Sequence, residues 1–176
     1  LPLASQPGSV FNYGRSTDLL GMLIAKIEAK TLYEVMQEKI FTPLGMSDTF
    51  FDVPTDKKHR CAPNFGFDNN GQLVQLNSVP LNMAMTDRPK DLAYQSGGQG
   101  LWSTMDDYLQ FAKIFIGHGS VDKVQILKKE TTDLMCTNHL TPEQRANSYL
   151  MGNPIFKLDY GFGLGVAVAM QDAKYG

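Results

Sequence analysis

The sequence predicts a mainly helical chain with one short β-hairpin and a C-terminal strand. Three observations support this fold class. Apolar residues recur at three- and four-residue steps over residues 17–30, 32–41 and 103–116, which is the spacing of one face of an α-helix. An Asn70-Gly71 pair lies between two short strand-like segments, as in a tight hairpin. The segment Gly161–Met170 has the composition of a strand.

The first predicted helix begins at Ser16, whose hydroxyl can cap the free amides of the first turn. Asp18 lies in that turn, where a negative charge is favoured by the helix dipole. We expect the apolar stripe of this helix to be buried in a core. The stripe consists of Leu19, Leu20, Leu23, Ile24 and Ile27.

The second predicted helix begins with a capping box, in which the Thr31 hydroxyl and the Glu34 carboxylate each satisfy a free backbone amide. Pro43 and Gly45 are expected to end it, because proline disfavours a helical residue before it and glycine supplies a turn conformation. The expected buried stripe consists of Leu32, Val35, Met36 and Ile40.

Residues 47–100 are rich in Pro, Gly, Asn and Asp. The one regular element predicted there is the hairpin of Asn64–Asp68 and Gln72–Leu76. An irregular segment of this length is uncommon in a compact domain. We therefore expect it either to pack against parts of the protein outside this chain or to form a wall of a binding site.

Ser103 is the expected N-cap of the third helix, and Gly117 its end. Shorter helices are predicted over Lys129–Cys136 and over Pro142–Tyr149, the latter capped by Thr141. The third helix should place one apolar set on a common face. This set consists of Met105, Tyr108, Leu109, Ala112, Phe115 and Ile116.

Composition narrows the functional classes. The 176 residues suffice for one domain or part of a larger protein, and 16 basic against 18 acidic residues give a net charge of −2, with no basic surplus for a nucleic-acid partner. The longest apolar stretches are shorter than the ~20 residues that cross a bilayer. Cys61 and Cys136 stand far apart, which excludes a disulfide scaffold and a zinc-finger site.

Four segments in order resemble the serine beta-lactamase-like family, which joins class C beta-lactamases, DD-peptidases and family VIII esterases. They span nearly the whole chain, so a chance coincidence is improbable, although each alone would be weak. The segments are Pro7–Gly21 (PGSVFNYGRSTDLLG), Ile40–Phe50 (IFTPLGMSDTF), Gly97–Tyr108 (GGQGLWSTMDDY) and Tyr160–Gly165 (YGFGLG).

The resemblance implies an acyl-enzyme mechanism built on three motifs: Ser-x-x-Lys, Tyr-x-Asn or Tyr-x-x, and a strand with Lys/His-Thr/Ser-Gly. Tyr13 falls where the family places its catalytic tyrosine, on a loop just before a helix. A phenol has a pKa of ~10, so it acts as a base only when a nearby cation lowers that pKa. The alternative is that Tyr13 is an aromatic side chain packed on the helix that follows.

Two further residues follow from the resemblance. Arg15 stands where the beta-lactamases carry Asn, so it is expected to bind a substrate carboxylate, and the pattern is nearer to the esterase branch; a surface salt bridge is the alternative. Trp102 follows a Gly-rich turn, residues 96–100, and is expected to line an acyl pocket. The alternative is a core position, which is common for a lone Trp.

The nucleophile and its lysine are expected to lie outside this chain. The one Ser-x-x-Lys string, Ser120–Lys123, sits in a Gly-flanked loop and follows Tyr13, whereas the family's serine precedes the tyrosine. No Lys/His-Thr/Ser-Gly triplet occurs. Because the chain also begins without Met, we expect an internal piece of a longer hydrolase. The expected parent fold is an α/β domain plus a helical domain, with residues 1–158 in the helical domain and 159–176 starting the returning sheet.

The function that the resemblance implies is hydrolysis or transfer of an acyl group from a small ester or amide, by an enzyme resembling an esterase or transesterase. Such an enzyme is expected to need neither a metal nor an organic cofactor. The second hypothesis is a beta-lactamase or penicillin-binding DD-peptidase, and the third is a catalytically silent homologue or binding module. The chain alone is expected to be inactive, to need the missing parts of the same protein and to self-associate. The sequence leaves its cellular location open.

Overall fold

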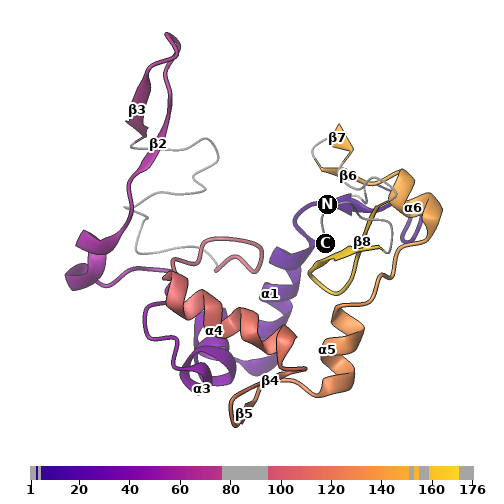
Figure 1. Ribbon diagram of the computed structural model, residues 1–176, viewed down its shortest axis with the longest axis horizontal. Helices are drawn as coiled ribbons and strands as arrows, with labels where there is room; N and C mark the ends of the chain where they lie inside the picture. The colour runs from indigo at the N-terminus through magenta and orange to yellow at the C-terminus, as the bar shows by residue number, and fades with distance from the viewer. Residues whose placement is uncertain (1–2, 4, 77–94, 151–152, 155–158, 171–176) are drawn as a thin grey trace. The chain divides into compact units, whose positions relative to one another are not determined.

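The computed structural model describes residues 3, 5–76, 95–150, 153–154 and 159–170 (Figure 1). They form two compact units, residues 17–108 and residues 1–16 with 109–176, each described here by itself. The longest helix has 13 residues and the longest strands have 4. The described part of the chain is thus mainly helical with small strands.

The helices of the unit formed by residues 17–108 follow closely on one another. Helix α1 (Ser16–Glu28) precedes α2 (Leu32–Met36), the π-helical turn η1 (Gln37–Phe41) and α3 (Thr42–Leu44). The capping box is confirmed: the Glu34 amide donates to the Thr31 hydroxyl at 3.2 Å, and the Thr31 amide donates to the Glu34 carboxylate at 2.7 Å.

The second helical segment ends later than predicted. Pro43 does not stop it; helical geometry continues to Leu44, and Gly45 ends it in the left-handed region at φ 69°. Because Pro43 has no N–H, the carbonyl of Lys39 cannot receive its usual helical hydrogen bond. The turn just before Pro43 is correspondingly widened, with the Thr42 amide donating to the Gln37 carbonyl.

The core of this unit lies under α2 and α3. The ring of Tyr33 lies 6.1 Å from that of Phe41 and 6.2 Å from that of Phe51, measured between centroids. Met36 and Ile40, expected in the core, are only half-buried. The buried apolar side chains are Leu32, Val35, Phe41, Leu44, Met46 and Phe51.

The prediction that the α1 stripe is buried is wrong for the structure described. Its five members are 41–79% exposed, and the buried residues of α1 are Asp18 and Gly21. The reason is that α1 packs through Gly21, whose Cα approaches Leu32 and Gly97 so closely that a Cβ would clash. The stripe itself faces solvent.

The segment 47–100 holds more regular structure than predicted. A 3₁₀-helix, η2 (Thr55–Arg60), follows Pro54, and strands β2 (Asn64–Phe67) and β3 (Leu73–Leu76) form the predicted antiparallel hairpin. Asp68 supports the turn by accepting from the amides of Asn70 and Gln72, both at 2.9 Å. Residues 77–94 lie outside the described residues.

Helix α4 (Met105–Ile116) is present, but its cap and its face differ from the prediction. Thr104, not Ser103, caps it, since the Thr104 hydroxyl accepts from the Asp107 amide at 3.2 Å. Of the predicted common face, Ala112 and Phe115 are half-buried and the other four residues are exposed, whereas Ile114 is buried.

The other unit contains small strands and two short helices. Its strand β1 (Asn12–Tyr13) pairs in parallel with β6 (Tyr149–Leu150), which pairs antiparallel with β7 (Asn153–Pro154). Strands β4 (Ser120–Val121) and β5 (Val124–Gln125) form a tight hairpin.

Helix α5 (Lys129–Met135) matches its prediction, whereas α6 (Pro142–Ala146) is shorter than predicted. The Thr141 hydroxyl caps α6 as expected, accepting from the Gln144 amide at 3.1 Å. Beyond Ala146 the chain leaves helical geometry at Asn147 and enters β6, which ends the helix before Tyr149.

The predicted C-terminal strand is in fact a hairpin of β8 (Tyr160–Phe162) and β9 (Ala167–Ala169). Gly165 makes the reversal possible, with φ 90°. Gly161 and Gly163 press against Asn138 and the Met135 carbonyl, where a Cβ would clash. Gly161 and Gly163 therefore serve close packing, whereas Gly165 serves the turn.

Candidate active site

Tyr13 lies in the short strand β1, not on the loop that was predicted. It is 49% exposed, and its ring meets Phe162 edge-on with centroids 6.1 Å apart. Phe11 packs on the same Phe162 ring at 4.9 Å. Among the described residues the Tyr13 hydroxyl has no hydrogen-bond partner. The Tyr13 ring thus packs against Phe162 while about half of the residue stays exposed.

Arg15 lies two positions after Tyr13 on the same segment, just before α1, and its side chain is exposed. Tyr13 and Arg15 therefore share one short stretch of chain. Trp102 belongs to the other compact unit, within residues 17–108.

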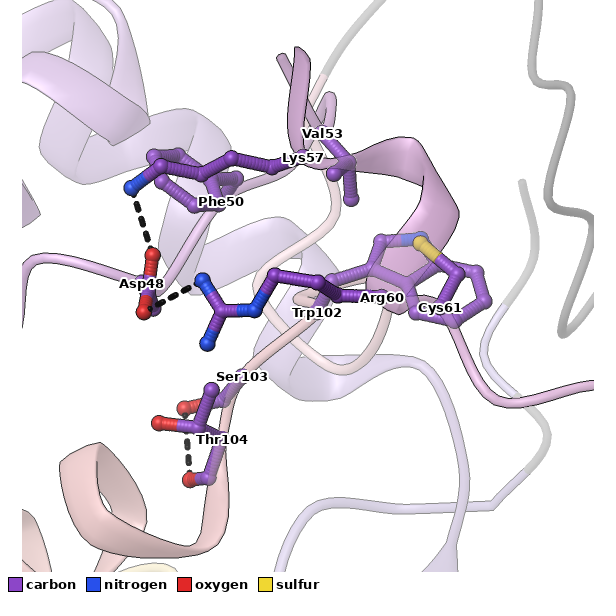
Figure 2. A pocket seen from close by; sticks show the side chains of 9 residues that line it. All are labelled: Asp48, Phe50, Val53, Lys57, Arg60, Cys61, Trp102, Ser103 and Thr104. Atoms are coloured by element: carbon purple, nitrogen blue, oxygen red, sulfur yellow. Dashed lines mark hydrogen bonds and ion pairs between the residues drawn. The ribbon is translucent and has the colours of Figure 1, made fainter. Parts of the chain in front are cut away.

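Trp102 is half-buried and fixed by its backbone. It exchanges two hydrogen bonds with Phe50, at 2.7 and 2.8 Å, in an isolated antiparallel bridge. Its side chain lines a cavity of about 90 Å³ (Figure 2). Phe50 and Trp102 form the aromatic part of the wall, and Asp48, Lys57 and Arg60 form the charged part.

The charged wall is an ion cluster centred on Asp48. Its carboxylate accepts from the Lys57 ammonium at 2.5 Å and from the Arg60 guanidinium at 2.8 Å (Figure 2). These two donors, Lys57 first, hold the pKa of Asp48 below its ordinary value of 3.8. The Lys57 ammonium also lies 5.1 Å from the centre of the Phe50 ring.

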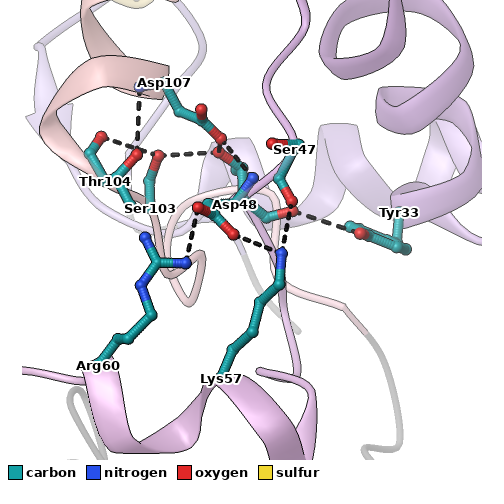
Figure 3. Close-up of polar contacts among 9 residues, drawn as sticks. Tyr33, Ser47, Asp48, Lys57, Arg60, Ser103, Thr104 and Asp107 are labelled. Atoms are coloured by element: carbon teal, nitrogen blue, oxygen red, sulfur yellow. Dashed lines mark hydrogen bonds and ion pairs between the residues drawn. The ribbon is translucent and has the colours of Figure 1, made fainter.

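A second polar network lies behind this cluster (Figure 3). The buried carboxylate of Asp107 accepts from the Asp48 amide at 2.7 Å and from the Thr49 hydroxyl at 2.9 Å. The Thr49 and Ser103 hydroxyls are hydrogen-bonded at 2.8 Å. The first turn of α4 is thereby tied to the chain around Asp48, and so to the cavity wall.

The Gly-rich turn before Trp102 is attached to α1. The Asp18 carboxylate, in the first turn of α1, accepts from the Ser96 hydroxyl and from the Gly98 amide, the latter at 3.2 Å. Asp18 is only 8% exposed.

Ser120–Lys123 does not adopt the helical geometry expected of a catalytic Ser-x-x-Lys. The string forms strand β4 and the turn that leads into β5, with Asp122 in the left-handed region at φ 51°. A serine and a lysine share one face at this spacing only in a helix, which this segment is not. The structure therefore agrees with the rejection of this string.

Sequence reasoning missed Asp18, Asp48 and Asp107 as structural centres of this region. The sequence marked Asp18 only as an acidic residue in the first turn of a helix, a position where the side chain is usually exposed. Asp48 meets its cations through the fold of η2, a 3₁₀-helix with no apolar periodicity that could reveal it.

Among the described residues no three His, Cys, Asp or Glu side chains are grouped so that they could hold a metal ion. None of the described helices has the length and hydrophobicity needed for a bilayer crossing.

Comparisons with known proteins agree on one family. The family model described as Beta-lactamase matches residues 1–173. An uncharacterised protein of Mycobacterium tuberculosis is 37% identical over 174 residues, covering 99% of this chain and 41% of that protein. Lovastatin esterase of Penicillium rubens is 29% identical over 188 residues, covering 97% of this chain and 44% of the esterase.

Solved structures show the same fold. The simvastatin synthase of Aspergillus terreus superposes with a TM-score of 0.78 at 24% identity, covering 99% of this chain and 44% of that chain. The chain thus spans less than half the length of the relatives that it matches. Since the family model covers nearly every residue, the chain belongs to the Beta-lactamase family.

Proposed function

We propose that this chain is part of a serine hydrolase that forms an acyl-enzyme on an ester or amide, with Tyr13 as the general base. The observation that carries the proposal is the placement of Tyr13. It lies in a segment that resembles the family's tyrosine motif, within the residues that the family model matches. It is half-exposed, and its hydroxyl has no hydrogen-bond partner among the described residues.

The proposed chemistry needs a phenolate and a serine. Tyr13, as phenolate, takes the proton of the serine hydroxyl while the serine oxygen bonds to the acyl carbon. When the bond from the acyl carbon to the leaving oxygen breaks, Tyr13 returns that proton to the leaving group. Water or an alcohol then repeats the sequence to release the acyl group. The serine, and the lysine that pairs with it in the family's Ser-x-x-Lys motif, are proposed to come from parts of the protein outside this chain.

Esters are the favoured substrate class. Arg15 places a fixed cation where the beta-lactamases carry an amide side chain, and it suits a substrate carboxylate better than a lactam side chain. The relative named lovastatin esterase supports ester cleavage. Trp102, in its partly aromatic cavity, is proposed to contact the acyl group.

We retain the domain assignment as part of the proposal: residues 1–158 belong to a helical domain, and residues 159–176 begin the sheet of an α/β domain. The β8–β9 hairpin supports it, because a two-stranded ribbon needs further strands or a helix for stability.

The test uses the whole protein that contains these residues. Tyr13→Phe removes the hydroxyl and keeps the ring on Phe162, and it should lower kcat for p-nitrophenyl acetate by about 10²–10⁴-fold. Tyr149→Phe is the matched control, since Tyr149 is 38% exposed on the neighbouring strand β6, and it should leave kcat unchanged. Equal losses in both variants would contradict the base assignment.

Two other outcomes would replace the proposal. Faster turnover of nitrocefin than of short-chain esters would favour a beta-lactamase or DD-peptidase. Failure of a fluorophosphonate probe to label any serine, together with no turnover of either substrate, would identify a catalytically silent homologue.

A further inference from the structure

Asp18 is a buried carboxylate that the proposed mechanism does not use. It is 8% exposed, although an aspartate in a first helical turn is ordinarily solvated. Its Oδ1 accepts from two groups of the Gly-rich turn, the Ser96 hydroxyl and the Gly98 amide. Burying a charge is costly unless such donors compensate it, so these two bonds hold the turn against α1.

The contact between this turn and α1 is close. A Cβ on Gly97 would clash with the Thr17 carbonyl and would lie 3.1 Å from the Cα of Gly21. A Cβ on Gly21 would in turn lie 2.9 Å from Leu32. Backbone therefore meets backbone at Gly97, and the Asp18 carboxylate supplies the side-chain bonds there.

The anchored turn leads directly into Trp102. Three residues, Gln99 to Leu101, separate Gly98 from Trp102, and Gly100 among them takes φ 101°. The far side of the turn is held by the Phe50–Trp102 bridge. So short a segment cannot absorb a shift of one end without passing it on to the other.

We propose that Asp18 is a positioning residue that sets the orientation of Trp102 through the Gly-rich turn, and so the fit of the acyl group. The part that concerns the acyl group rests on the function proposed above. The part that concerns Trp102 rests only on contacts within residues 17–108.

Three substitutions in the whole protein separate the effects. Asp18→Ala removes the acceptor, whereas Asp18→Asn keeps an Oδ1 acceptor of the same shape. Asp106→Ala is the matched control, because Asp106 lies in the first turn of α4 as Asp18 does in α1 but is exposed.

The first readout does not depend on activity. The emission of Trp102 is obtained by subtracting the emission of the same protein carrying Trp102→Phe. Its quenching by acrylamide is then measured. We expect Asp18→Ala to raise the quenching constant, and Asp18→Asn and Asp106→Ala to leave it near the wild-type value. Unchanged quenching in Asp18→Ala would overturn the proposal, whether or not the protein cleaves esters.

The second readout is the dependence on acyl size, with rates expressed per fluorophosphonate-titrated serine. Asp18→Ala should raise KM for a p-nitrophenyl ester of an aromatic acid by about tenfold, as expected for a misplaced binding group, and should barely change KM for the acetate. In a Trp102→Ala background the same substitution should have no further effect, because the two residues act as one unit.

A uniform loss of titratable serine with unchanged KM would show that Asp18 only supports folding, and would refute the positioning role. If Asp18→Ala alters the quenching of Trp102 but the wild-type protein cleaves no ester, the link between Asp18 and Trp102 stands. The proposed ester function is then rejected. The two claims can thus fail separately.

Discussion

Phe50 and Trp102 exchange two backbone hydrogen bonds, with the Trp102 amide 2.7 Å from the Phe50 carbonyl and the Phe50 amide 2.8 Å from the Trp102 carbonyl. The bridge joins chain segments that η2 and the β2–β3 hairpin separate in sequence. Because the bonds involve only main-chain atoms, another side chain at position 102 can form the same two bonds. Trp102 can therefore be exchanged to probe the cavity without opening the bridge.

Arg15 should direct the enzyme away from beta-lactams. At equal concentration, we expect the whole protein to turn over short-chain p-nitrophenyl esters faster than nitrocefin, since a guanidinium cannot reproduce the contacts of the family's Asn. Arg15→Asn should lower the ratio of ester turnover to nitrocefin turnover by about tenfold. This is the effect of one charged hydrogen bond of ~1.5 kcal/mol. Arg15→Lys keeps the charge without the amide and should leave the preference as it is. A wild-type preference for nitrocefin would reverse the assignment.

The Asp48 cluster should stabilise the protein only above acidic pH. Its pKa is lowered on folding, so the stabilisation is fully present above the ordinary value of 3.8 and is lost as the pH falls through the lower, folded value. Asp48→Asn should therefore lower the unfolding midpoint in urea at pH 7 and lower it less at pH 3. Because Lys57 and Arg60 are partly exposed, 1 M NaCl should reduce the difference at pH 7. The exposed Asp52→Asn is the control, and a difference independent of pH would contradict this account.

Gly97→Ala should destabilise the protein by ~1–3 kcal/mol, the range found for overpacked positions. The added methyl group meets the backbone of Thr17 and Gly21, which cannot move aside as a flexible side chain could. Gly14→Ala is a suitable comparison for stability alone, because its Cβ would meet only the Asn12 carbonyl, at 3.9 Å. Equal urea midpoints for the two variants would show that the Gly-rich turn yields more easily than the structure suggests.

Residues 1–176 expressed alone should not hydrolyse esters, since the proposed serine and its lysine come from elsewhere in the protein. The chain should also self-associate, because the apolar stripe of α1 is exposed. Light scattering and a p-nitrophenyl acetate assay beside the whole protein test both expectations. Ester turnover that a Ser120→Ala change abolishes would mean that Ser120–Lys123 had been rejected wrongly.

The elements that local chemistry determines were predictable, and those that distant contacts determine were not. The Thr31 capping box, the Thr141 cap and the Asn70-Gly71 hairpin depend on neighbouring residues, and each is present where it was expected. The α1 stripe has helical spacing, but spacing cannot tell which face finds a partner. At the start of α4, the Ser103 hydroxyl is bonded to Thr49, which is remote in sequence, and Thr104 is the cap.

The same distinction holds for the candidate site. Tyr13, Arg15 and Trp102 were found from motif resemblance, which gives their places in the sequence but none of their contacts. Asp18 was visible only as a helix-start acid, because its donors lie almost eighty residues away, in the Gly-rich turn. No pattern along the chain encodes that pairing.

The π-helical turn Gln37–Phe41 places one more residue in the helix than regular α-helical bonding would hold. Deleting a single residue from this turn would restore α-helical bonding, yet it would rotate all that follows by about 100° around the axis. Phe41 and Leu44, now 3% and 9% exposed, would then turn out of the core. The extra residue thus sets the rotational register of the helix at Pro43, and with it the faces of Phe41 and Leu44 that meet the core before Gly45 ends the helix.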